Sequence, residues 1–328
     1  MGTSSDDPGT RLDAAVAEGR LPGLHAVIAA RAGQVVLERY YAGDDYKLGR
    51  RLGPIAFGPE VLHDLRSVSK SIVALLYGIA LSRKRVPGPE IPLLDVFDYP
   101  QLRTEPGRLA LTIGHALSMT MGIEWNENLP YTDPRNGEIA MEHALDRYRY
   151  VLSRPIDRPP GTTWTYCGGA TALLGHLIAR GSGMTLLEYA HKALLTPLGI
   201  EKAEWSLGSN GETAAASGLR LSARDLLRIG QCVAASGETV VPAAWIGEIT
   251  TKRVAIDKEI DYGWHWYLYN ASAGGWPWWA GFGNGGQRLY VVPKTGLVAV
   301  IFCGNYDKPN QGQVARQVWL QHVLGVPD

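Results

Sequence analysis

Cysteine is scarce in this sequence, and the few cysteines that it has form no pattern. Cys167, Cys232 and Cys303 are odd in number and far apart, so they show neither the ligand spacing of a zinc site nor a disulfide framework. The N-terminal segment also lacks the basic and apolar stretches of an export signal. These features suit a reducing compartment, and we expect a cytoplasmic protein.

Net charge and long apolar runs are missing as well. The chain of 328 residues has 32 basic and 32 acidic side chains, and no basic stripe suggests binding to nucleic acid. No apolar run is long enough to span a bilayer. The eight histidines show no HExxH motif and no paired ligand spacing. We therefore expect no nucleic-acid partner, no membrane partner, no metal and no cofactor.

Two common enzyme signatures are absent too. No serine has glycine both two residues before it and two residues after it, which argues against a Ser-His-Asp hydrolase with a nucleophile elbow. Gly281, Gly283 and Gly286 match the GxGxxG spacing, but a strand pattern follows them and no βαβ unit surrounds them. A dinucleotide site needs a helix at that point, so we reject this interpretation.

One stretch of the sequence carries a strong chemical signal. The segment from Val68 to Leu81 is apolar on every side, which is typical of a buried helix. Lys70 is the only charge inside it, and Ser67 lies one helical turn earlier, with Asp64 as a candidate cap. Burial should hold the pKa of Lys70 well below that of a free lysine. A hydroxyl beside a neutral amine at a helix N-terminus would be an activated nucleophile, although most Ser-x-x-Lys pairs are simply a solvated helix face.

The N-terminal half predicts two strands followed by helices. A short helix over residues 9–19 precedes two strands joined at Ala32-Gly33, and residues 43–60 look like a loop. After the buried helix, a second helix begins at the cap Thr112 and ends at Gly122. A long loop then leads to one amphipathic helix over residues 138–152.

The C-terminal half returns to strands. Two helices follow residue 168, and a third has Ser222 as its cap and Gly237 as its stop. From Asp261 the pattern predicts three strands and then a final helix over residues 311–323. The simplest assembly is an α+β fold in which both chain ends form one antiparallel sheet with flanking helices, and the helical middle is an insertion. We place the sheet domain at residues 1–66 and 256–328 and the mainly helical domain at residues 67–255, with a cleft between them.

Two further elements fit a Ser-Lys enzyme. Tyr166 stands at the end of an extended run in a glycine-flanked turn, where it could carry a proton, although an isolated tyrosine is more often a core residue. The stretch GFGNGGQ from Gly281 to Gln287 could expose backbone N–H groups as an oxyanion hole. By itself it could equally be a hairpin without a function.

With these three motifs in order, SVSK at Ser67, YCG at Tyr166 and GFGN at Gly281, nearly the whole chain resembles one family. It contains class C serine β-lactamases, D-alanyl-D-alanine peptidases, family VIII carboxylesterases and nylon-oligomer hydrolases. The resemblance implies a β-lactamase/transpeptidase-like fold with Ser67 as nucleophile and Lys70 as base or proton relay. Tyr166 would pass the proton to the leaving group and help to activate the water that removes the acyl group. The resemblance also implies that the backbone N–H groups of Ser67 and Asn284 form the oxyanion hole.

Two departures from the β-lactam enzymes bear on the substrate. Their Tyr-x-Asn motif is Tyr166-Cys167-Gly168 here, so a side-chain amide is missing at Gly168. Their Lys-Thr-Gly motif is Gly281-Phe282-Gly283, so no cation stands there to receive a carboxylate. Both departures favour the esterase and amide-hydrolase branches, and the loop with Tyr131 looks most like the nylon-oligomer hydrolases.

We therefore expect a hydrolase that takes a small-molecule ester or unstrained amide through an acyl-enzyme, as a monomer or homodimer. Alternatives are a β-lactamase or peptidase, an acyltransferase on the same scaffold, and a non-catalytic binding protein. The expected substrate-binding residues are Trp125, Tyr131, Gly168, Phe282 and Gly283, although core packing is the more common role of a single tryptophan.

Overall fold

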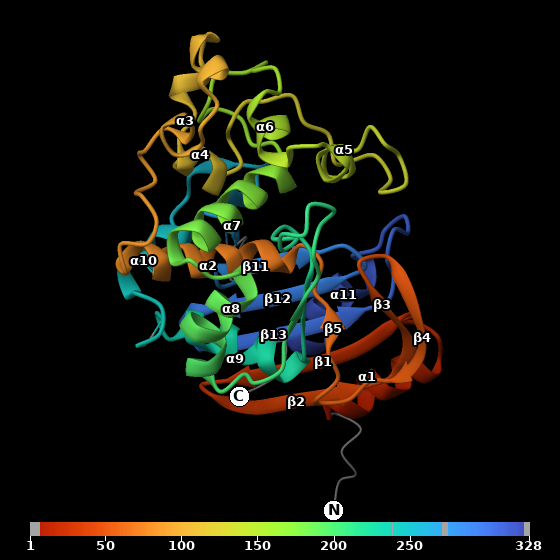
Figure 1. The fold of residues 1–328 in the computed structure, drawn as a ribbon. Helices are drawn as coiled ribbons and strands as arrows, with labels where there is room; N and C mark the ends of the chain where they lie inside the picture. The colour runs from red at the N-terminus through yellow and green to blue at the C-terminus, as the bar shows by residue number, and fades with distance from the viewer. Residues whose placement is uncertain (1–6, 238, 271–274, 325–328) are drawn as a thin grey trace, which may run out of the picture.

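An antiparallel sheet of eight strands forms the lower half of the molecule in Figure 1. The computed structural model describes residues 7–237, 239–270 and 275–324. The strands lie in the order β2-β1-β13-β12-β11-β10-β9-β8. Their bounds are β1 (Leu24–Arg31), β2 (Gln34–Tyr40), β8 (Val254–Ala255), β9 (Ile260–Tyr262), β10 (Tyr267–Tyr269), β11 (Trp278–Gly283), β12 (Gln287–Val292) and β13 (Leu297–Cys303).

The two chain ends meet inside this sheet. β1 pairs with β13, and Ala29 lies opposite Ala299. β1 and β2 are joined at Ala32 and Gly33, which both have positive φ, as a two-residue hairpin turn requires. Every neighbouring pair of strands is antiparallel. The predicted α+β fold class, with one antiparallel sheet from both chain ends, is therefore confirmed.

Helices cover both faces of the sheet (Figure 1). On one face lie α1 (Pro8–Ala17), α11 (Gln313–Val318) and the π-helical turn that follows it (Trp319–Val323), in a core that they share with β1 and β13. On the other face lie α2 (Val68–Ser82) and α9 (Ala223–Ala234). Because helices press on both sides, every residue of β13 is buried.

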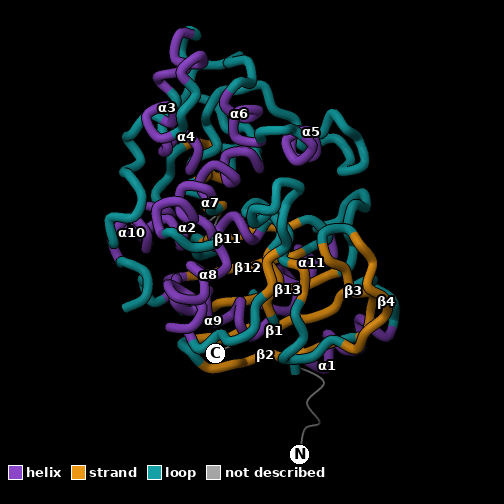
Figure 2. The backbone as a smooth tube through the Cα atoms, viewed as in Figure 1, coloured by secondary structure: helices purple, strands orange, loops and turns teal. Residues whose placement is uncertain are grey.

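The upper half of the molecule consists of helices and loops, as Figure 2 shows. α7 (Gly168–Ser182) packs against α2 and links this upper half to the helices on the sheet. The helices outside the sheet faces are α3 (Leu93–Val96), α4 (Ile113–Leu117), α5 (Gly137–His143), α6 (Arg147–Leu152), α7 (Gly168–Ser182), α8 (Leu186–Ala190) and α10 (Ala243–Ile249). α9 packs on the sheet although it belongs to the segment expected to be helical, so the domain boundaries stay a prediction.

Four predictions of secondary structure were wrong. Between residues 260 and 303 the described part of the chain forms five strands, β9 to β13, in place of the three that the pattern predicted. Residues 43–60 contain the hairpin of β3 (Ala42–Lys47) and β4 (Arg50–Ala56) instead of a loop. The helix expected over residues 138–152 is two helices, because Ala144 is extended and the Asp146 carboxylate caps the second one. α4 begins at the cap Thr112 as predicted, but it ends at Leu117, five residues before Gly122.

A small second sheet, which the sequence pattern did not predict, lies beside the start of α2. It consists of β5 (His63–Asp64), β7 (Leu219–Leu221) and β6 (Glu204–Trp205), in that order. This sheet holds the segment after β6 next to α2, because Leu65 donates its N–H to the Leu219 carbonyl.

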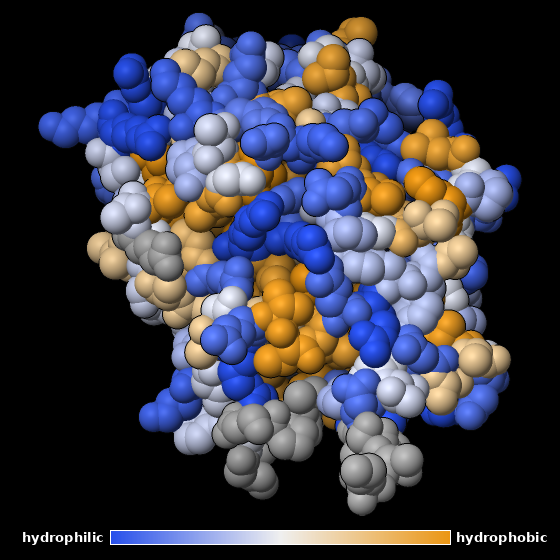
Figure 3. Space-filling view, turned by 90° about the horizontal axis from the view of Figure 1, so that it is seen from below, coloured by the Kyte–Doolittle hydropathy of each residue, from blue (hydrophilic) through white to orange (hydrophobic). Residues whose placement is uncertain are grey.

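Seen from below, the surface is mostly hydrophilic and has one apolar hollow near its centre (Figure 3). Within the described ranges, none of the helices combines the length and the hydropathy that a transmembrane span requires. The expected cytoplasmic location stays a prediction.

Candidate active site

Ser67 and Lys70 meet at the N-terminal end of α2. Lys70 Nζ donates a hydrogen bond of 3.0 Å to Ser67 Oγ and another of 2.9 Å to the Ala216 carbonyl. Both side chains are buried, with 8% of Ser67 and 2% of Lys70 exposed. The helix has no solvated face at this point, so the pair is not the ordinary surface Ser-x-x-Lys arrangement.

The candidate cap of α2 was wrong. Asp64 does not cap the helix, because its carboxylate accepts hydrogen bonds from the N–H groups of Leu48 and Arg66. It also lies 3.2 Å from the Arg66 guanidinium in a buried ion pair. The N-cap residue is Ser67 itself, and its side chain makes no capping bond, which leaves Oγ available for chemistry.

Tyr166 completes the group that the motifs predicted to gather. Its ring centroid lies 4.8 Å from Lys70 Nζ. Burial raises the pKa of Tyr166, and the nearby Lys70 and Ser67 offset this only in part. At neutral pH the hydroxyl therefore holds its proton beside the other two side chains.

The expected low pKa of Lys70 was wrong. Burial does lower the pKa of this amine, but Tyr166, Glu138 and Glu127 raise it more, and the net shift is upward. The prediction took only burial into account, because the two carboxylates lie far from Lys70 in the sequence. Lys70 is consequently an ammonium ion in the free protein at neutral pH.

Two buried carboxylates lie where Gly168 leaves room. Glu127 Oε1 would stand 3.0 Å from a Cβ atom on Gly168, and Glu138 Oε2 would stand 3.2 Å from it. Glu127 Oε1 also accepts the Gly168 N–H and, at 2.6 Å, the indole N–H of Trp125. Burial and the nearby Glu138 raise the pKa of Glu127 to about 7. Neither carboxylate was predicted from the sequence, because no motif or spacing links them to Ser67.

The end of β11 lies against the segment that leads into Ser67. A Cβ atom on Gly281 would stand 2.9 Å from Ser71 Oγ, and one on Gly283 would collide with the Leu65 carbonyl. Only glycine allows this close approach. Among the described residues, no backbone carbonyl accepts the N–H of Ser67 or of Asn284, so both donors remain available.

Phe282 faces away from this site, contrary to expectation. Successive side chains of a strand point to opposite faces, and the neighbouring glycines face α2. The Phe282 ring therefore packs with the aromatic rings of Tyr290 and Tyr269 on the other side of the sheet, beneath the Arg288 guanidinium. It also stacks on Tyr267, with ring centroids 4.7 Å apart, and Tyr267 lines the pocket described next. Phe282 does not contact Ser67.

Trp125 and Tyr166 line one open pocket of about 440 Å³. The walls of this pocket include two further aromatic side chains and one arginine, and Glu127 lies in the same wall. Tyr131 lies near Glu138 and Glu127, and burial together with these carboxylates raises its pKa. The pocket is lined by Trp125, Glu127, Asn128, Arg158, Trp164, Thr165, Tyr166 and Tyr267.

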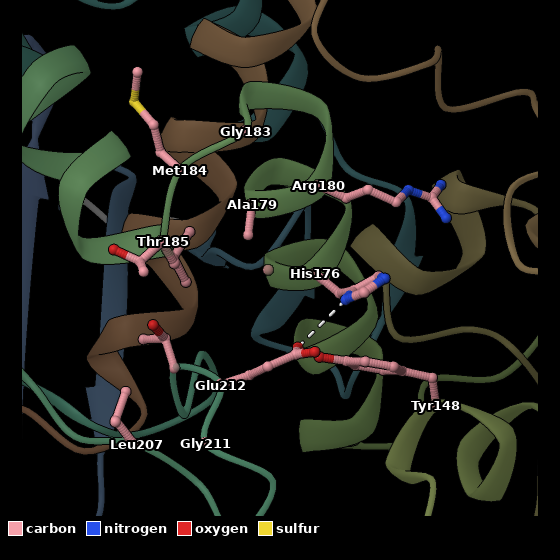
Figure 4. Close-up of a pocket in the computed structure, with 13 residues that line it drawn as sticks. Tyr148, His176, Ala179, Arg180, Gly183, Met184, Thr185, Leu207, Gly211 and Glu212 are labelled. Carbon is pink, nitrogen blue, oxygen red and sulfur yellow. Dashed lines mark hydrogen bonds and ion pairs between the residues drawn. The ribbon is translucent and has the colours of Figure 1, made fainter.

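A second pocket of about 360 Å³ lies between α7, the start of α8 and the loop around Gly211. Figure 4 shows His176 and Tyr148 pointing toward the Glu212 carboxylate in this pocket. None of Ser67, Lys70 and Tyr166 lines it, so it is separate from the chemistry described above. In the part of the chain that the structure describes, no three side chains gather as metal ligands would.

Known proteins resemble this chain over most of its length. The profile of the beta-lactamase family matches residues 10–323. A 6-aminohexanoate-dimer hydrolase from Paenarthrobacter ureafaciens is 26% identical over 329 aligned residues, which cover 90% of this chain and 78% of that protein.

Solved structures show the same fold. A class C β-lactamase from Rhodobacter sphaeroides has a TM-score of 0.70 at 18% identity, covering 95% of this chain and 97% of its own. EstCE1, a hydrolase with promiscuous acyltransferase activity, has a TM-score of 0.72 at 15% identity, covering 93% of each chain. These matches confirm the β-lactamase-like resemblance and its fold.

Proposed function

The chain belongs to the beta-lactamase family, and we propose that it is a serine hydrolase that cleaves carboxylic esters or unstrained amides through an acyl-enzyme. The observation that carries this proposal is the 3.0 Å hydrogen bond between Lys70 Nζ and the buried Ser67 Oγ, beside the Tyr166 ring. A nucleophile within reach of a base, with a third group beside them, is the arrangement of covalent catalysis.

Acylation requires a form of the site that has lost one proton. Both Lys70 and Tyr166 hold a proton in the free protein, because the pKa of each is raised. Once this pair has given up one proton, it can accept the hydroxyl proton of Ser67 while Oγ attacks the substrate carbonyl. Tyr166 then passes the proton to the departing alcohol or amine.

The negative charge of the tetrahedral intermediate needs donors in fixed positions. The N–H groups of Ser67 and Asn284 are the candidates, since the end of β11 lies against residues 65 and 66. Losing one such donor typically costs about 3–4 kcal/mol of transition-state stabilisation.

The surroundings of Gly168 favour neutral acyl groups. In place of the side-chain amide of the β-lactam enzymes, this chain presents the carboxylates of Glu127 and Glu138. A substrate carboxylate at this wall would meet like charges, whereas an ester or a linear amide brings no charge next to the reacting carbon. The amide-hydrolysing relative from Paenarthrobacter ureafaciens supports the amide side of the proposal.

The alternatives use the same scaffold. A β-lactamase or a D-alanyl-D-alanine peptidase would need a cation for the substrate carboxylate, and the place of that cation is Gly281. An acyltransferase differs only in the molecule that attacks the acyl-enzyme, and the likeness to EstCE1 keeps it as a second candidate. A binding protein would have no need of a buried Ser67–Lys70 pair.

The test is a panel of p-nitrophenyl esters, linear amides and a cephalosporin, assayed with the wild-type protein and with Ser67→Ala. We expect the short neutral esters to be hydrolysed, with Ser67→Ala losing on the order of a millionfold in rate. Activity of Ser67→Ala within about tenfold of wild type would remove Ser67 from the mechanism.

A further inference from the structure

One carboxylate in the wall of the active-site pocket has no structural partner for one of its oxygens. Glu127 lines the pocket together with Tyr166. Both of the hydrogen bonds that Glu127 accepts, from the Gly168 N–H and the Trp125 indole, go to Oε1. Its Oε2 is buried and has no hydrogen-bond partner among the described residues. Buried polar atoms without a partner are rare, and each one calls for an explanation.

Glu138 does not supply that partner. Glu138 Oε2 approaches the same point above Gly168 as Glu127 Oε1, and it too is buried without a hydrogen-bond partner among the described residues. The other oxygen of Glu138 accepts a hydrogen bond of 2.9 Å from Ser217. Glu127 lines the pocket and Glu138 does not, so Glu127 Oε2 is the oxygen left for a molecule that enters it.

Resting on the acyl-enzyme function proposed above, we propose that Glu127 is the general base of deacylation and takes the proton of the water that hydrolyses the ester on Ser67. A positioned carboxylate can activate water in this way, and such proton transfer contributes typically 10²–10⁴-fold to the rate. The two N–H donors hold Oε1 and thereby fix the direction in which Oε2 points. The pKa of about 7 lets Glu127 both accept and release a proton near neutral pH.

The protons of this step balance once Glu127 and the Lys70–Tyr166 pair have exchanged theirs with solvent. The water oxygen forms a bond to the acyl carbon while one of its protons moves to Glu127 Oε2. The bond between the acyl carbon and Ser67 Oγ then breaks, and Oγ takes a proton from the Lys70 ammonium. Glu127 afterwards loses its proton to solvent through the open pocket, and the Lys70–Tyr166 pair regains the one that it gave up.

Several other titratable groups face Glu127, and its protonation depends on them. Glu138 raises the pKa of Glu127 and Lys70 opposes that shift. The remaining titratable or charged side chains around it are Tyr131, Arg158, Tyr166, Cys167, Tyr262 and Tyr267.

The decisive experiment compares acylation with deacylation in Glu127→Gln, using p-nitrophenyl acetate in a stopped-flow instrument. We expect a burst of p-nitrophenol equal to the enzyme concentration, at a rate at least equal to that of wild type, because Glu127 raises the pKa of Lys70. Steady-state turnover should then fall roughly 10²–10⁴-fold, and intact-mass measurement should find the acetyl-enzyme accumulated. A burst that disappears together with turnover, or turnover that is unchanged, would overturn the assignment.

Two matched variants separate this role from a structural one. Glu124→Gln removes an exposed carboxylate paired with Arg154 on the same loop, and we expect burst and turnover to match wild type. In Glu138→Gln the pH limb of kcat should move to lower pH, because Glu138 raises the pKa of Glu127. In Glu127→Gln this limb should vanish, and an unchanged limb would contradict the proposal.

The outcome also distinguishes this inference from the function on which it rests. If wild type forms no acyl-enzyme, the hydrolase proposal fails. If wild type forms one and Glu127→Gln only raises KM for substrates that carry an ammonium group, with kcat unchanged, Glu127 is a substrate-binding residue and the base assignment is overturned.

Discussion

Glu127 Oε1 lies 3.0 Å from the point where a Cβ atom on Gly168 would stand. The same oxygen accepts the N–H of Gly168, so the carboxylate and the glycine form one local unit. Gly168 therefore does more than remove the amide side chain that the β-lactam enzymes carry at this position. It makes the space in which a buried carboxylate approaches Lys70 and Tyr166.

Restoring the amide at this position should damage the enzyme. In Gly168→Asn the new side chain would collide with Glu127 and Glu138, so we expect kcat/KM for short esters to fall at least about tenfold. Penicillin hydrolysis should not appear. A double variant with Glu127→Ala should be strongly non-additive, since both changes act on one contact. Additive losses would show that the two positions are independent.

Lys70→Arg should be nearly inactive. A guanidinium ion keeps its proton at any accessible pH, so it cannot accept the proton of Ser67. The measurement is steady-state ester hydrolysis by Lys70→Arg across the pH range, beside wild type. In wild type kcat/KM, which reports acylation, should rise with pH along a limb that belongs to the Ser67–Lys70–Tyr166 unit as a whole. An active arginine variant would exclude the base role.

Glu127 should make the folded protein less stable as the pH rises. Its pKa in the folded state, about 7, lies above the value of about 4.5 that it takes when unfolded. Between these values the folded state binds more protons than the unfolded state, so the free energy of unfolding falls with rising pH. Glu127→Gln removes this pH-dependent contribution to the free energy of unfolding. Its melting temperature should exceed that of wild type at pH 8 by more than it does at pH 5, and equal differences at both pH values would contradict the shifted pKa.

The closeness of Ser67 and Lys70 could be predicted from the sequence, whereas the charge on Lys70 could not. Ser67 and Lys70 are one helical turn apart, and that spacing alone puts them together. Glu127 lies in the loop after α4 and Glu138 lies in α5. They come near Lys70 only because of how this loop runs and how α5 packs, and the local sequence pattern shows neither. The orientation of Phe282 was mispredicted for a related reason. The sequence pattern did not show that β11 includes residues 281–283, and the alternation of side chains along a strand turns the Phe282 ring to the other face.

Cys167 should be dispensable although it follows Tyr166. Burial, and after it the nearby Glu127, raise the pKa of this thiol, so it is not a thiolate at neutral pH. Cys167→Ser should keep ester hydrolysis within a few-fold of wild type. Inactivation as complete as that of Ser67→Ala would contradict the mechanism.

Short neutral esters should be preferred over penicillins and D-Ala-D-Ala peptides by roughly a hundredfold or more in kcat/KM, since the side-chain amide and the cation that hold β-lactam substrates are both missing. Gly168 and Gly281 occupy those two places. The measurement is kcat/KM for an ester series and for benzylpenicillin in one buffer. The Arg288 guanidinium is already engaged, because it donates to the carbonyls of Gly283 and Gln287 and lies over the Phe282 ring. Penicillin turnover equal to that of the best ester would contradict this account of specificity.

The central claim is that substrate acyl groups become bonded to Ser67. The most direct measurement is peptide mapping by mass spectrometry after brief reaction with a short p-nitrophenyl ester and acid quenching. The account predicts one acyl group per chain, carried by the peptide that contains Ser67, and none on Ser67→Ala. An adduct on another residue, or ester turnover without any adduct in either wild type or Glu127→Gln, would contradict it.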